Sequence, residues 1–172
     1  MGKISKLYLM IHPTPRNAQK VRLYFERWEE YLSEAVADPE AALCVLSNSP
    51  PQMAEVSTTV SKLFGDRCFI DPDDWSDETK LKYVEVVDKT FAVRGAHGKH
   101  GTYGLWTDRN AIRWAEGLKM DLAARGFTYS PNDLQVFAFG AMWGGCMTKY
   151  AALMPSHLGV ERTPEILPEL CH

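Results

Sequence analysis

Short apolar runs alternate along the chain with longer segments in which apolar residues recur every three or four positions. The short runs predict strands, and the recurring stripes predict amphipathic helices. The expected strands are residues 6–11, 42–46, 68–70, 90–93 and 134–139. The expected helices are residues 14–37, 49–63 with a stop at Gly65, 76–86, 107–126 and 146–154.

Strands that alternate with helices in this way predict a three-layer α/β sandwich with a mostly parallel, Rossmann-like central sheet. At 172 residues, with no linker that would divide it, the chain is expected to form a single domain, residues 1–172. The tail, residues 155–172, holds three of the ten prolines. It is expected to be poorly structured or to pack on the domain, with only residues 160–163 as a short strand.

Composition narrows the range of partners. Apolar residues make up 45% and charged residues 24% of the chain, as in ordinary globular proteins. A net charge of −3 and the lack of a basic block argue against nucleic acid. No apolar run is long enough for a membrane span, and the first run reads as a strand and not as a signal peptide.

The four cysteines are scattered and form no CxxC pair, which favours reduced thiols and a cytoplasmic protein. We expect a small-molecule substrate and no cofactor, and the sequence leaves a homo-oligomer open.

The strand ends carry the candidate chemistry. Carboxyl ends of parallel strands meet at one edge of a sheet, where α/β proteins bind their ligands. The residues expected at this edge are His12, Ser47, Asn48, residues 71–74, Arg94, Trp143 and Cys146.

Cys146 follows a turn that contains Gly140, Gly144 and Gly145, and it opens the last predicted helix. Unpaired N–H groups at a helix start favour negative charge, so a thiol there loses its proton more easily. Cys146 is therefore a candidate nucleophile. The alternative is a small buried residue behind a glycine-rich turn, because free cysteines are among the most buried residue types.

The other polar residues each have two interpretations. His12 is either a general base or a hydrogen-bonded turn histidine. Asp71, Asp73 and Asp74 either bind a metal or, as we favour, form a capping turn.

The glycine-rich segment 94–106 is expected to be a loop. It is not a Walker phosphate loop, because His100 follows Lys99 where Ser or Thr is required. His97 and His100 lack the third ligand that a zinc site needs, so no metal is expected. Lys99 remains a candidate cation beside the thiol.

Taken together, three segments resemble the isochorismatase-like cysteine hydrolases. The run VFAFGAMWGGC has that family's spacing from strand to nucleophile, Lys99 precedes Trp106-Thr107-Asp108 at nearly the family's distance, and KLYLMI matches its first strand. His12 occupies the place of the family's catalytic Asp, residues 107–140 form a longer stretch than usual, and only 26 residues follow Cys146.

The resemblance implies an isochorismatase-like fold and hydrolysis of a small amide or related carbonyl compound through an acyl-enzyme. It implies that the Cys146 thiolate attacks, that Lys99 favours the thiolate and that His12 takes the proton. The backbone N–H groups of Cys146 and Gly145 would stabilise the oxyanion. Trp143 and Trp106 would wall the substrate site, with Arg94 and Asn48 as further substrate-binding residues.

Two alternatives remain. The missing acid and short tail are also compatible with a non-catalytic α/β binding or assembly protein that keeps a degenerate pocket. A phosphoryl-handling enzyme that uses His12 and Arg16 is less favoured, because Ile11 and Pro13 stand where histidine phosphatases set Arg and Gly.

Overall fold

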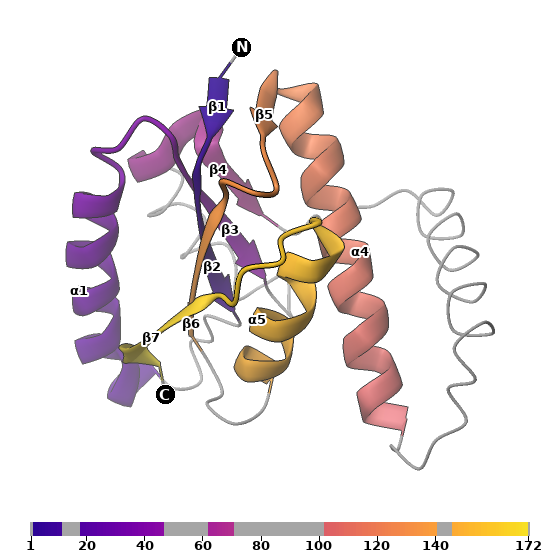
Figure 1. The fold of residues 1–172 in the computed structure, drawn as a ribbon. Coiled ribbons are helices and arrows are strands. Elements are labelled where there is room, and N and C mark those ends of the chain that lie inside the picture. The colour runs from indigo at the N-terminus through magenta and orange to yellow at the C-terminus, as the bar shows by residue number, and fades with distance from the viewer. Residues whose placement is uncertain (1, 12–17, 47–61, 71–101, 141–145, 172) are drawn as a thin grey trace.

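The computed structural model describes residues 2–11, 18–46, 62–70, 102–140 and 146–171. Their regular elements follow one another in the order β1 (Gly2–Ile4), β2 (Lys6–Ile11), α1 (Ala18–Ala35), β3 (Ala41–Leu46), η2 (Gly65–Arg67), β4 (Cys68–Ile70), α4 (Thr102–Ala124), β5 (Phe127–Tyr129), β6 (Gln135–Gly140), α5 (Cys146–His157) and β7 (Glu165–Cys171). Figure 1 shows their arrangement.

The central sheet has five strands in the order β4-β3-β2-β6-β7, and each neighbouring pair is parallel. β2 is the middle strand, with Lys6 opposite both Ala41 and Gln135. β1 and β5 form a separate parallel pair. The predicted mostly parallel α/β sheet is therefore confirmed for the described strands.

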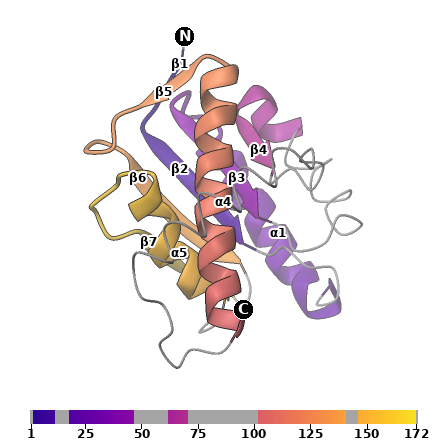
Figure 2. The ribbon, with the colours of Figure 1, turned by 90° about the vertical axis from the view of Figure 1, so that its right-hand side faces the viewer.

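Helices cover both faces of this sheet. α1 lies on one face, and α4 and α5 lie on the other, as the two perpendicular views show (Figures 1 and 2). Parallel strands need crossovers that run over the faces of the sheet, which explains why both faces are covered. The described elements thus have the layers of an α/β sandwich.

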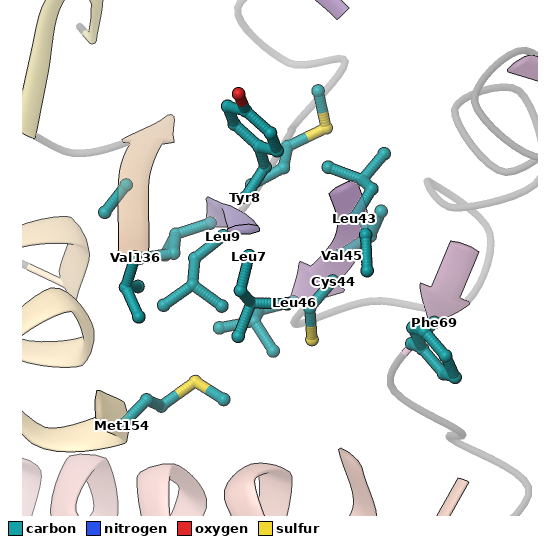
Figure 3. Packing of buried hydrophobic residues seen from close by; sticks show 14 of the residues in the cluster. Leu7, Tyr8, Leu9, Leu43, Cys44, Val45, Leu46, Phe69, Val136 and Met154 are labelled. Atoms are coloured by element: carbon teal, nitrogen blue, oxygen red, sulfur yellow. The ribbon is translucent and has the colours of Figure 1, made fainter. Parts of the chain in front are cut away.

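The side chains of β2 alternate between the two faces, although nearly all of them are buried. Figure 3 shows Leu7 and Leu9 on the side of Met154 in α5, with Tyr8 on the opposite side. β2 therefore reads as a continuous apolar run because a sheet covered on both faces buries both sets of side chains.

Trp28 anchors α1 to the sheet. Its indole Nε1 donates a 2.8 Å hydrogen bond to the carbonyl oxygen of Leu170 in β7, and its ring lies 5.9 Å from that of Phe139. One turn further, Tyr31 meets Tyr8 edge to face at 5.9 Å between ring centroids. Trp28 belongs to the apolar stripe expected for this helix, and its burial confirms the stripe at that position.

Two helix boundaries differ from the prediction. α4 begins at Thr102 and not at Thr107, so residues 102–106 are helical and not part of a loop. Gly104 alone costs about 1 kcal/mol in a helix, which does not stop one of 23 residues. α5 passes Pro155 and ends at His157. Buried Leu158 then follows, and Gly159 closes the end at φ 78°.

The tail is also structured, contrary to the prediction. Residues 165–171 form β7, whereas residues 160–163 are not a strand. β7 pairs regularly at Ile166 and again at Cys171, and residues 167–170 stand opposite Phe139 alone. Pro168 lies in this irregular stretch, where a missing ladder N–H is tolerated.

Both glycines that were expected to end helices lie among the described residues. Gly65 and Gly126 adopt positive φ values of 54° and 75°, so both predicted helix stops are confirmed. β1 and β5 were not predicted, because a polar residue interrupts each of these three-residue strands, whereas the equally short β4 is apolar throughout. The helix start at Thr14, most of residues 49–63, and the elements at 76–86 and 90–93 lie outside the described residues.

Arg67 fastens the end of α1 to the start of β3. Its guanidinium donates to the carbonyl oxygens of Val36, Asp38 and Ala41 at 3.0, 2.6 and 2.8 Å. Val36 and Asp38 follow the last residue of α1, at the negative end of the helix, where a positive charge is favourable.

We expect Arg67→Ala to lower the free energy of unfolding by about 2 kcal/mol, because hydrogen bonds from a charged donor to these carbonyls are lost. Urea denaturation measures the change. Lys62→Ala removes the same charge at an exposed position nearby and should change stability by less than about 0.5 kcal/mol. Equal losses in the two variants would contradict the capping role.

Burial, aided by the neighbouring Tyr8 and the carboxylates of Glu165 and Glu169, raises the pKa of Tyr31 to about 12. Since the ordinary pKa is about 10, the native state holds this proton more tightly than the unfolded chain does. The stabilisation is complete below pH 10 and is lost as the pH rises through 12. We expect Tyr31→Phe to flatten the fall of the urea midpoint between pH 10 and 12. An unchanged slope would contradict the assignment.

Candidate functional site

The carboxyl ends of the central strands lie side by side. Ile11 at the end of β2 stands opposite Leu46 of β3 on one side and Gly140 of β6 on the other. From β2 the chain continues to β3 on one side of the sheet, and it returns later to β6 on the other. The order of the strands therefore reverses between β2 and β6, and open α/β sheets bind ligands at such a switch point.

Gly140 brings the backbones of β6 and β2 unusually close at this point. Its φ is 122°, and a Cβ atom there would lie 2.0 Å from the carbonyl oxygen of Ile11. Only glycine fits such an approach without a shift of the backbone. A side chain at position 140 would therefore force β6 away from β2 at the last residue of the strand.

α5 begins six positions after Gly140, with Cys146 as its first residue. Met147, Tyr150, Ala151 and Met154 are buried at helical spacing and hold α5 against the sheet. The ring of Tyr150 lies 4.5 Å from that of Trp114 in α4, which covers α5 from outside. The start of α5 is therefore fixed in the core from its second residue onward.

Position 146 lies at the start of a helix, where the backbone carries a partial positive charge. The first N–H groups of a helix have no partner within the helix and carry partial positive charge. A thiolate at a helix start is stabilised by that charge, which is one of the known ways in which a cysteine becomes reactive.

A second cysteine, which the sequence did not suggest, lies at the same edge. Cys171 ends β7 opposite Gly140 and is buried, with its Sγ 3.1 Å from the carbonyl oxygen of Leu167. Burial raises the pKa of the Cys171 thiol, in spite of a hydrogen bond from Gly140. Cys171 is thus a protonated, packed thiol. The sequence did not point to Cys171, because the tail was not expected to form a strand of the sheet.

The remaining predicted site residues are not brought together by the described structure. Trp106 lies in the second turn of α4. The other candidates fall outside the described residues, namely His12, Asn48, Arg94, Lys99, Trp143 and Gly145, together with His97, His100 and residues 71–74. Their roles stay predictions.

Two kinds of feature, a metal-ligand cluster and a membrane-spanning helix, are absent from the described residues. Within the described ranges, no three His, Cys, Asp or Glu side chains gather in a way that would hold a metal ion. None of the helices described is both long and apolar enough to cross a membrane.

We expect Gly140→Ala to cost about 3 kcal/mol or more in unfolding free energy, because the new methyl group would overlap the Ile11 carbonyl at an unfavourable φ. Gly159→Ala is the matched control. Its φ is 78°, but its Cβ would lie at an ordinary 3.5 Å from Pro131, so about 1 kcal/mol is expected. Similar losses in both variants by urea denaturation would show that the close approach is unimportant.

Comparison of the chain with family models, with curated proteins and with solved structures finds no significant match.

Proposed function

We propose that the protein is a small-molecule hydrolase of the cysteine type, which acts on an amide or related carbonyl compound through Cys146. One observation supports this proposal above the others. Cys146 is the first residue of a helix that begins six positions after Gly140, the residue of β6 that stands opposite the end of β2. A thiol, helix-terminal N–H groups and a strand-end crevice are the parts that such a reaction needs in one place.

In the proposed reaction, the Cys146 thiolate attacks the carbonyl carbon and forms a C–S bond. The C–N bond of the amide then breaks, and the amine leaves after it has taken a proton. Water attacks the resulting thioester, which releases the acid and restores the thiol. Backbone N–H groups at the start of α5, that of Cys146 among them, stabilise the negative oxygen formed in each attack.

The proton transfers are assigned to residues outside the described ranges. We propose that His12, which follows β2 directly in the sequence, accepts the thiol proton. Lys99 favours the thiolate through its charge. The resemblance to isochorismatase-like hydrolases supports these roles and the amide substrate.

We expect Cys146 to react with iodoacetamide at least ten-fold faster than the other three thiols at pH 7. Cys44, Cys68 and Cys171 are buried, which slows their labelling, and a helix N-terminus in general favours the thiolate form of a cysteine. Mass spectrometry of peptides follows each site over time. The rate at Cys146 should reach half its maximum below pH 8.5, the ordinary thiol value.

Exposure alone would also speed labelling, so the pH profile is the decisive part. A Cys146 rate with a midpoint at or above pH 8.5, or a rate equal to that of the buried thiols, would contradict an activated nucleophile.

Turnover is tested with p-nitrophenyl acetate, whose attack by a thiolate releases p-nitrophenolate and leaves an acetyl thioester. We expect a burst equal to the protein concentration that Cys146→Ala abolishes. Cys171→Ser, at the neighbouring strand end, should keep the burst if the fold is unchanged by circular dichroism. A folded wild-type protein without a burst would favour the non-catalytic alternative.

A further inference from the structure

A groove lies between α1 and β7, lined by residues other than those proposed to take part in the hydrolysis. It has a volume of about 280 Å³. Its lining residues are Arg27, Glu30, Tyr31, Glu34, Glu169 and Leu170. The four residues from α1 recur at positions i, i+3, i+4 and i+7, so they form one stripe of the helix that faces the edge of the sheet.

The rim of the groove is acidic. Glu30, Glu34 and Glu169 carry three negative charges against the single positive charge of Arg27, and all four side chains are exposed. Glu165, on the same strand as Glu169, also acts electrostatically on Tyr31. The potential at this surface is therefore negative, beyond what the net charge of −3 spread over the chain would give.

The floor of the groove is apolar and firmly held. Leu170 is buried there, and its carbonyl oxygen accepts the hydrogen bond from the Trp28 indole. The half-buried ring of Tyr31 packs against Tyr8, which stacks on Phe137 at 4.9 Å between centroids. An aromatic ring beside carboxylates favours a cation, because the ring face is itself negative.

We propose that this groove is a docking site for a basic peptide segment of a partner protein, in which Lys or Arg side chains flank an apolar residue. The apolar residue lies on the floor at Leu170 and Tyr31. The cationic side chains meet Glu30, Glu34 and Glu169 on the rim.

Size and charge favour this occupant over others. Sites that enclose a drug-sized ligand are usually about 300–1,000 Å³, so an open groove of about 280 Å³ suits side chains presented by a longer chain better than a whole small molecule. An acidic rim repels nucleic acid and anionic lipid surfaces. Among the described strands, β7 stands at the end of the central sheet, and its residues Glu169 and Leu170 line the groove, so an extended peptide can lie along this strand.

The test uses the full chain and a fluorescein-labelled Lys-Leu-Lys-Leu-Lys peptide, with a Glu-Leu-Glu-Leu-Glu peptide as the charge-reversed probe. Fluorescence anisotropy should detect binding of the basic peptide alone, weakened several-fold by a rise in salt from 50 to 500 mM. In an NMR titration, the indole N–H signal of Trp28 should shift, because its acceptor Leu170 lines the groove.

Glu30→Gln and Glu169→Gln should each weaken binding by about two- to five-fold, as for exposed ion pairs. Arg27→Gln should strengthen it. Glu29→Gln is the matched control, since it makes the same charge change on the same helix outside the groove lining, and its affinity should stay within two-fold of wild type.

Three results would overturn the proposal. They are an unshifted Trp28 signal at saturating peptide, equal weakening by Glu29→Gln and Glu30→Gln, and equal binding of the acidic peptide. A dimer in sedimentation experiments that Glu30→Gln dissociates would assign the groove to a second copy of the chain instead.

Discussion

The structure depends on the parallel pairing of β2 with strands on both of its sides. Leu7, Leu9 and Ile11 are almost fully buried, and each stands opposite a residue of β3 and a residue of β6. A middle strand of this kind has no solvent-facing side, so helices must cover both faces. The same parallel direction gathers the strand ends at one edge. The parallel pairing of β2 therefore accounts both for the buried core and for the edge at which the candidate site residues are expected.

Gly140 is the last residue of β6 and stands opposite Ile11 of β2, six positions before Cys146 in the sequence. Buried residues from Met147 onward hold the helix that begins at Cys146. The nucleophile candidate is therefore preceded and followed along the chain by elements that pack in the core.

The sequence predicted the strands that are apolar throughout, and it failed where tertiary contacts override local preferences. The runs at β2, β3, β4 and β6 were found because a strand buried on both faces is apolar throughout. β7 was missed because Pro168, Glu165 and Glu169 break any such pattern. What makes it a strand is the pairing with β6 and the hydrogen bond from Trp28, both distant in sequence. The start of α4 was misplaced because a glycine-rich stretch was read as a loop.

For the candidate site, the sequence correctly placed Cys146 at the start of a helix, whereas Gly140, expected in a turn after residues 134–139, is the last residue of β6. It could not show that Cys171 would lie opposite Gly140, since that follows from the missed strand. β7 also connects the groove beside α1 with the carboxyl edge of the central sheet. Leu170 lines the groove beside α1, and the next residue ends the strand at the edge where the nucleophile candidate lies. The irregular stretch before Cys171 is held by Trp28 on one side and by Gly140 on the other. It is therefore a packed part of the sheet, and Leu170 within it also lines the acidic groove.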